Sequence, residues 1–356
     1  MSKTTIHTLY DQFRSQNLSL PEIYHALNIR HGINFDTDED HSPAGIEPSY
    51  DTRLWQIERF MRHIENGDAL PYDIRKTIRI HDPFINESMR LIDSWLQDFR
   101  SAFWYSPHVE LFFVTTISFP EVIRCGGYPL TEYARHDLAS VANNYIATLR
   151  TNMQTRQFKE KIRHREENST RSFVKSVQYM DALFDHYRRM VVLRLDFYLS
   201  KDHREQEGEP LEPLLCHFST LRDQMQRKVG VFEHLVGYIA RIEYGAKKGH
   251  HVHALFFFDG DHVRNYYGLA TCIVEQWHKL TNGHGRYFNT QEKFLQYRCR
   301  AIGMIVRENI EMRQCLAYVI WYITKLDQFL PYKYSDKQRL FFRGELLSAL
   351  PRHCAE

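Results

Sequence analysis

The chain has 356 residues, 43% of them hydrophobic, which is enough material for two packed domains. Its longest apolar runs, 111–114 and 254–258, are far shorter than the ~20 residues that a membrane-spanning helix needs. The 46 basic and 44 acidic side chains give a net charge of only +2, so composition alone does not indicate a nucleic-acid-binding protein. Six scattered cysteines without Cys-x-x-Cys spacing argue against a thiolate zinc site and a disulfide framework. We therefore expect a globular protein of the reducing cytoplasm with no membrane segment.

Residues 1–168 are expected to form a mainly helical region. An acidic stretch at 36–40 is typical of a solvated loop, and apolar spacing between 52 and 103 predicts amphipathic helices with a break near Gly67. Residues 109–119 are rich in β-branched and aromatic side chains and precede Pro120, so they predict a strand. Residues 134–165 have helical character and many basic side chains, which form either a solvated helix face or a phosphate-contacting surface. The chain then changes to strands, and we place a domain boundary there.

The second region, 169–335, predicts an α+β domain with an antiparallel sheet and helices packed on it. In residues 191–199, strand alternation places five apolar side chains on one face and Arg194, Asp196 and Tyr198 on the other. A helix from about 214 to 228 separates this strand from a β-hairpin whose arms are 236–244 and 250–258. Residues 336–356 are expected to form a C-terminal tail.

The second arm of the hairpin carries His251 and His253, which share one face of the strand. Two imidazoles at alternate positions can bind one divalent ion, and Glu243 on the opposing arm would add an oxygen ligand suited to Mg²⁺ or Mn²⁺. With 20 histidines, a His-x-His triplet is expected about once by chance, so a buried hydrogen-bonded pair is the alternative. The histidine triad of nucleotide hydrolases is excluded because residue 255 is Leu.

The second candidate cluster lies on a predicted helix at residues 315–328. Helical spacing places five aliphatic side chains along one stripe, and Tyr318, Tyr322 and Lys325 together on the other side. The two phenols are one turn apart, roughly 6 Å along the axis, so both could reach one metal-bound phosphate. The alternative is that these amphipathic phenols line a core or an interface.

The histidine strand and the Tyr-x-x-x-Tyr-x-x-Lys helix together resemble HUH endonucleases in their order and approximate separation. Within this superfamily the pair resembles the two-tyrosine replication initiators of small single-stranded DNA phages. Segments 194–196, 249–255, 275–277 and 322–328 are similar to the inovirus replication-protein family, which includes prophage-encoded YagK/YfjJ-type proteins. The resemblance covers roughly 172–335, and members of this group need not have the earlier tyrosine. Two segments compete as the first superfamily motif: the strand at 191–200, and 113–118, which would start the catalytic domain near residue 105.

The resemblance implies a sheet of HUH/Rep type and a rolling-circle replication initiator that nicks and rejoins single-stranded DNA with Mg²⁺ or Mn²⁺. Tyr322 would form a 5′-phosphotyrosine bond, with the metal held by the two histidines and Glu243. Lys325 would stabilise the charged phosphate, and Tyr318 would allow a second cleavage.

The implied substrate is single-stranded or hairpin DNA at a replication origin in a bacterial host cell. Plausible contacts are Arg194, Arg241, Lys247 and Lys248, for each of which a solvated surface charge is the alternative. Because the chain has no Gly-x-x-x-x-Gly-Lys-Ser/Thr loop, a helicase as well as a polymerase would come from the host. Residues 1–168 would bind origin duplex, recruit the helicase or mediate oligomers.

Three other functions fit the same motifs. A plasmid relaxase or a single-strand transposase also pairs histidines with a catalytic tyrosine. A non-catalytic prophage DNA-binding regulator would retain the fold without the reaction, and a structural protein would carry the motifs by coincidence. The presence of both histidines, Tyr322 and Lys325 argues against loss of the active site.

Overall fold

The computed structural model describes residues 50–74, 78–101, 103–126, 132–206, 211–245, 248–289, 301–325 and 339–345. These residues form two compact units, and the boundary between them falls within one helix, between Glu167 and Asn168. We call the described residues up to Glu167 the helical unit and those from Asn168 onwards the sheet unit. No helix in the described ranges has the length and apolar character that crossing a membrane requires.

The helical unit consists of α3 (Tyr50–Asn66), α4 (Pro83–Met89), α5 (Ile92–Leu96), α6 (Pro107–Ser118), α7 (Glu132–Met153) and the first part of α8 (Arg156–His186). Between α3 and α4 lies a short hairpin of β1 (Tyr72–Asp73) and β2 (Arg79–Ile80), and the 3-10 helix η1 (Pro120–Gly126) follows α6. The helices share one apolar core, in which the rings of Phe60, Trp95 and Phe112 meet at centroid distances of 5.6–6.3 Å. The mainly helical character expected of this region is confirmed.

The strand predicted at 109–119 is wrong, because this segment is helix α6. The Ser106 hydroxyl accepts a hydrogen bond from the backbone N–H of Val109, and Pro107 follows it, which is a strong helix start. Val109, Phe112, Phe113 and Thr116 are buried at the spacing of one helical face. The cap and this burial outweigh the β propensity of the side chains, so segment 113–118 is not a sheet strand and does not serve as the first superfamily motif.

A buried ionic network joins α3 to α6. His108, with 1% of its side chain exposed, contacts Glu58 through Nδ1 at 3.2 Å and Glu65 through Nε2 at 2.9 Å. The Ser106 hydroxyl donates to Glu58, and Arg62 pairs with the same carboxylate. Burial opposes ionisation of both central groups, but their pairing outweighs it, so the pKa of His108 is raised and that of Glu58 falls to about 2.

We expect this network to stabilise the helical unit most strongly between pH 4.5 and 6.5. The contribution of Glu58 is lost as the pH falls from 4.5 towards 2, because its pKa is depressed on folding; that of His108 is lost as the pH rises from 6.5 through its raised value. His108→Gln should therefore cost about 1.5–3 kcal/mol near pH 5.5 and less at either extreme. Hydrogen exchange of α3 and α6 peptides measures this difference, and a pH-independent difference between pH 4 and 8 would contradict it.

The sheet unit contains six antiparallel strands. They are β3 (Arg189–Leu199), β4 (Leu235–Gly245), β5 (Gly249–Asp259), β6 (Gly285–Asn289), β7 (Gly303–Val306) and β8 (Phe341–Arg343). The spatial order is β6-β3-β5-β4-β8, and β7 pairs with the first half of β3 while β6 pairs with the second half. The α+β fold with an antiparallel sheet is confirmed. However, β8 lies in the segment expected to be a tail, so the sheet extends beyond residue 335.

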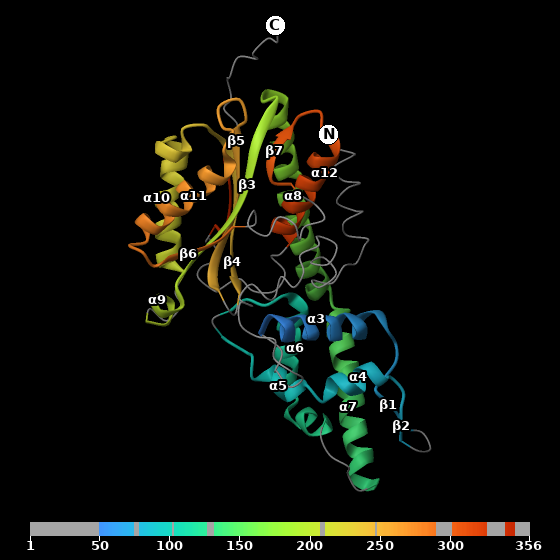
Figure 1. The fold of residues 1–356 in the computed structure, drawn as a ribbon. Helices are drawn as coiled ribbons and strands as arrows, with labels where there is room; N and C mark the ends of the chain where they lie inside the picture. Colours follow the sequence, from blue (N-terminus) through green and yellow to red (C-terminus); the bar gives the residue numbers. More distant parts are fainter. Residues whose placement is uncertain are drawn as a thin grey trace. The chain divides into compact units, whose positions relative to one another are not determined.

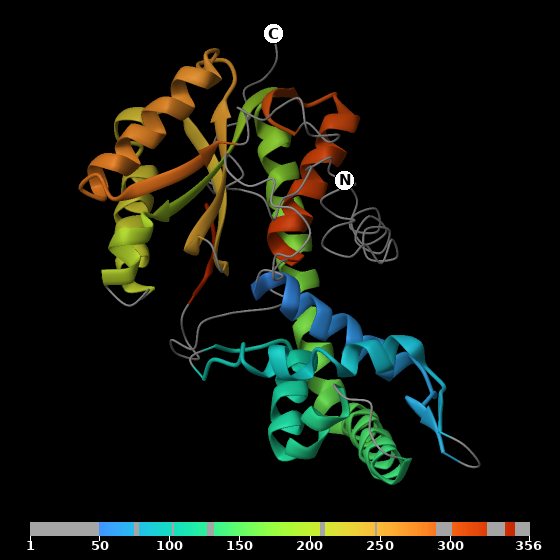
Figure 2. The same cartoon turned by 60° about the horizontal axis from the view of Figure 1, so that its bottom comes forward.

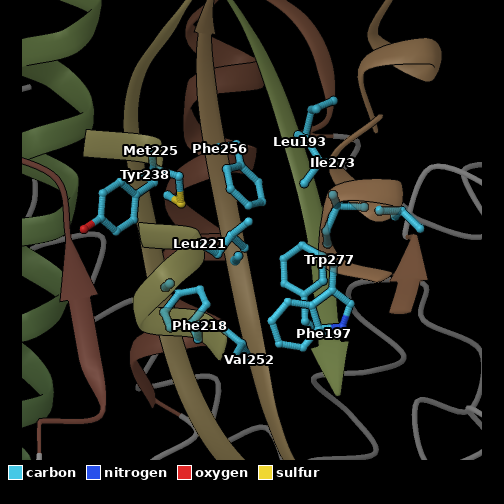
Figure 3. Packing of buried hydrophobic residues seen from close by; sticks show 14 of the residues in the cluster. Leu193, Phe197, Phe218, Leu221, Met225, Tyr238, Val252, Phe256, Ile273 and Trp277 are labelled. Carbon is cyan, nitrogen blue, oxygen red and sulfur yellow. The ribbon is translucent and has the colours of Figure 1, made fainter. Parts of the chain in front are cut away.

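Most side chains of one face of the sheet belong to an apolar core shared with α10 (Glu212–Gln226) and α11 (Tyr266–Leu280). Figures 1 and 2 show these two helices on the same side of the sheet. The alternating side chains of β3 from Val191 to Leu199 belong to this core, as the sequence predicted. Figure 3 shows Phe197 beside Trp277, with ring centroids 5.2 Å apart, and Phe256 further along the sheet. The short helix α9 (Lys201–Gln206) follows β3, and the 3-10 helix η2 (Gly230–Phe232) precedes β4.

The other face changes from apolar to polar part of the way along three strands. Val192, Leu255 and Ile239 belong to a core shared with the end of α8 and with α12 (Ile310–Lys325), which lie on this face in Figure 1. At the next alternate position on β5 and β4, the apolar side chains are replaced by His253 and Arg241. On β3 the change comes one row earlier, at Arg194, which lies opposite Leu255. The polar half of this face contains the candidate site residues of the sheet.

Candidate metal centre and nucleophile

Strand register places the polar side chains in two adjacent rows across the sheet. In antiparallel strands, residues directly opposite one another project from the same face. The first row runs from β6 to β4 through Phe288, Asp196, His253 and Arg241. The second row runs through Arg286, Tyr198, His251 and Glu243. The alternation of each strand thus concentrates charge and imidazole groups on one half of one face.

The candidate metal ligands predicted from the hairpin converge. Glu243 lies directly opposite His251, and ligand atoms of Glu243, His251 and His253 all lie within 4.8 Å of one another. The Nε2 atoms of the two histidines are 3.1 Å apart, and His253 Nε2 is 3.3 Å from Glu243 Oε2. A His₂-carboxylate set of this kind suits a divalent ion such as Mn²⁺ or Mg²⁺ with further positions open for oxygen ligands.

The other nitrogen of each ring is held by an acceptor. His251 Nδ1 donates to the carbonyl of Gly249 at 3.0 Å, and His253 Nδ1 lies 2.7 Å from the carboxylate of Asp196. Because these oxygens can only accept, they favour the tautomer with the proton on Nδ1, and two Nε2 lone pairs 3.1 Å apart would then repel unless a proton or a cation lay between them. The donor set therefore fits a metal ion, with Asp196 orienting one of its ligands.

The electrostatics of the two histidines differ. Burial, then the neighbouring His253 and Lys248, lower the pKa of His251 to about 3. Burial acts in the same direction on His253, but Asp196 and Glu243 outweigh it, so the pKa of His253 is raised. Burial opposes ionisation of Asp196, yet His253 and Arg194 keep its pKa far below the usual range. Without a metal, a proton on His253 can bridge the imidazoles, and a divalent ion would replace it.

Tyr322 reaches this centre from α12. Its ring centroid is 6.4 Å from that of His253, and the Arg194 guanidinium lies over the ring at 5.0 Å. Only 3% of Tyr322 is exposed. Tyr318, one turn earlier, is also buried and stacks on Trp321 at 5.3 Å. Both tyrosines lie in the core between the sheet, α8 and α12, as in the alternative that these amphipathic phenols line a core.

Lys325 is the last residue of α12, and its side chain lies outside the described residues. Lys247 lies outside them altogether. The structure thus places the predicted nucleophile Tyr322 beside the predicted ligands and leaves these two lysines without a structural account.

The three remaining predicted DNA contacts are not solvated surface charges. Arg194, Arg241 and Lys248 are 5%, 3% and 8% exposed. Arg194 Nε lies 3.7 Å from Asp196, and Arg241 Nε lies 3.4 Å from Glu243, so each arginine is close to a carboxylate on its own strand. Burial of a guanidinium requires such a partner. The sequence pattern did not show that Arg194 and Arg241 lie against α12 rather than in solvent.

Arg241 also connects the sheet to α12. Its Nη1 donates to the backbone carbonyls of Ile323 at 3.4 Å and Thr324 at 3.3 Å. Cations at a helix C-terminus pair favourably with its last carbonyls and its dipole. Ser169 of α8 also donates to the Thr324 carbonyl. One buried guanidinium therefore fixes the end of the tyrosine helix relative to the ligand Glu243.

Sequence reasoning missed two kinds of site residue. Asp196 was placed on the polar face but not assigned to His253, although direct opposition of the two residues follows from the register. Phe288 lies on β6, a short strand that the sequence analysis did not predict, directly opposite Asp196. Strand β6 borders β3 on the edge away from β5. The signal for Asp196 was that it lies two residues after Arg194 on one face of a strand, just as His253 lies two residues after His251.

Comparison with known proteins identifies the family of this arrangement. A family model described as the YagK/YfjJ C-terminal domain matches residues 131–342, more than half of the chain. The match spans the candidate metal ligands, Tyr322 and the strands β3 to β7. Searches of curated proteins and of solved structures gave no significant match. The chain therefore belongs to the YagK/YfjJ C-terminal domain family.

Proposed function

We propose that this protein is a metal-dependent, HUH-type DNA-nicking enzyme that initiates rolling-circle replication. The observation that carries the proposal is the convergence of a His₂-carboxylate donor set with a buried tyrosine, whose ring is 6.4 Å from the ring of His253. Membership in the YagK/YfjJ family supports a prophage setting. Within the HUH superfamily, β3 then takes the place of the first motif.

Each residue of the site would have its own role in the reaction. His251, His253 and Glu243 would hold Mg²⁺ or Mn²⁺, which supplies Lewis-acid polarisation of the scissile phosphate. The phenolic oxygen of Tyr322 would lose its proton and form the new bond to phosphorus, while the bond from phosphorus to the 3′ oxygen of the preceding nucleotide breaks and that oxygen takes up a proton. The products are a 5′-phosphotyrosine and a free 3′-hydroxyl, and the reverse attack rejoins the strand without ATP.

The surrounding cations stabilise charge as it develops. Arg194, which lies over the Tyr322 ring, favours negative charge on the phenol oxygen. Lys325 would contact the phosphate, and Tyr318 would carry out a second cleavage while the first tyrosine is occupied. The substrate would be single-stranded or hairpin DNA at an origin, with a host helicase and polymerase as partners.

The test is formation of a covalent protein–DNA adduct. The full chain is mixed with single-stranded DNA from its own locus and Mn²⁺, and the products are separated in SDS. We expect an SDS-resistant adduct that Tyr322→Phe and EDTA abolish. Tyr318→Phe retains the first adduct and loses only strand transfer to a second one. Absence of an adduct with every strand of the locus would favour a non-catalytic DNA-binding regulator.

A further inference from the structure

The polar half of the sheet continues past the metal ligands onto β3 and β6. Tyr198 lies directly opposite His251, and Phe288 lies directly opposite Asp196. Directly opposite residues have Cβ atoms about 4.5–5.5 Å apart and share a face. Two half-buried aromatic rings therefore lie on the same face as the candidate ligands. The nearer one, Tyr198, is on β3, the strand next to that of His251.

Lys248 lies over both of these rings. Its Nζ is 5.0 Å from the ring centroid of Tyr198 and 4.9 Å from that of Phe288, and the residue is 8% exposed. Aromatic faces stabilise a cation that has lost water, which explains how an ammonium group is held in this position. On β6, Arg286 lies directly opposite Tyr198 and is exposed. Cations and aromatic rings thus alternate along one side of the metal centre.

We infer that Tyr198, Phe288 and Lys248 form a nucleotide subsite that binds the single strand next to the scissile phosphate. The ring faces that Lys248 does not cover can stack unpaired bases of any sequence, and its ammonium group can bind the backbone phosphate between them. Duplex DNA does not offer free base faces, so the subsite selects single strands. The inference rests on the proposed function for the reaction that takes place beside the subsite.

The aromatic part of the subsite is tested by binding of a fluorescent fifteen-nucleotide oligo(dT) to the full chain in the Tyr322→Phe background, measured by anisotropy. Tyr198→Leu and Phe288→Leu should each lower the affinity about five- to hundred-fold, with an unchanged salt dependence. Tyr287→Leu is the matched control: this tyrosine is the preceding residue on β6 and projects from the opposite face, so affinity should not change.

The lysine is tested by salt dependence. Lys248→Met should reduce the slope of log K against log salt by about 0.7, the value for one lost phosphate contact on a single strand. Lys248→Arg should keep the slope. Lys279→Met is the control, since this exposed lysine is on α11, which covers the other face of the sheet.

The outcomes separate the subsite from the nicking reaction. Wild-type affinity in both leucine variants, or an unchanged slope in Lys248→Met, would overturn the subsite even if the Tyr322 adduct forms. A reduced affinity with no adduct would leave the subsite in place and remove the proposed function. Mn²⁺ affinity and thermal unfolding of each variant report folding, and Tyr198→Phe and Phe288→Tyr, which keep the rings, should bind oligo(dT) like the parent protein.

Discussion

His253→Ala is expected to destabilise the metal-free sheet unit by about 3–5 kcal/mol, whereas His251→Ala should cost about 1–2 kcal/mol. Both changes remove a ligand of the candidate metal centre. Only His253, however, pairs at 2.7 Å with the fully buried carboxylate of Asp196. Removing it leaves the buried carboxylate with only the more distant Arg194, at 3.7 Å, and Lys248 to offset its charge, while removing the neutral His251 takes no charge partner from Asp196. Urea unfolding in EDTA, followed through the fluorescence of Trp277 and Trp321, measures the difference.

The control for this asymmetry is the double variant His253→Ala/Asp196→Asn. Because the second change removes the buried charge, it should recover a substantial part of the lost stability, with a coupling energy of about 1–3 kcal/mol. Equal destabilisation by the two single histidine variants would show that the contact between His253 and Asp196 adds nothing to the free energy of unfolding. In Mn²⁺, all three variants should lose binding of the ion, since each lacks at least one Nε2 ligand.

The hairpin was predictable because its information is local. Period-2 alternation set the faces of His251 and His253, and the two glycines set the turn. Gly249 has a φ of +61°, which favours glycine, and a Cβ there would meet the guanidinium of Arg204. The register that follows brings Glu243 opposite His251, so a sequence pattern alone was sufficient to predict this triad.

Helix α12 shows what periodicity cannot predict. Its aliphatic stripe was predicted correctly, but residues 316–324 are buried on every side, because α8 and the sheet both pack against the helix. Tyrosine has both an apolar ring and a polar hydroxyl, so the helix side with Tyr318 and Tyr322 can face either solvent or a second buried surface. The choice depends on contacts with residues far away in the sequence, such as Arg241, Arg194 and Ser169, which no local pattern contains.

The burial of Arg194 and Arg241 could not be predicted for the same reason. Arg194 and Arg241 alternate with apolar neighbours as surface strand residues would, and sequence alone suggests solvated charges. Their burial depends on α12 lying over the polar half of the sheet and on the carboxylates Asp196 and Glu243 within 4 Å. The site is therefore an interior in which each buried arginine lies close to a carboxylate.

Arg241→Met should lower Mn²⁺ affinity about 10–100-fold and reduce adduct formation by at least as much, although Arg241 is not a candidate ligand. The guanidinium contacts Glu243 at 3.4 Å and donates to the carbonyls of Ile323 and Thr324 at the end of the tyrosine helix. Its loss removes the group that orients the carboxylate and frees two carbonyls next to Tyr322.

Arg241→Lys provides the matched comparison. Lysine keeps the charge but lacks the planar fork that reaches a carboxylate and two carbonyls together, so we expect it to recover Mn²⁺ affinity more than adduct formation. Titration with Mn²⁺ and the SDS adduct assay separate the two effects. If Arg241→Met binds Mn²⁺ and forms the adduct like the wild type, the guanidinium only fills space, and the placement of Tyr322 depends on the apolar core that α12 shares with α8.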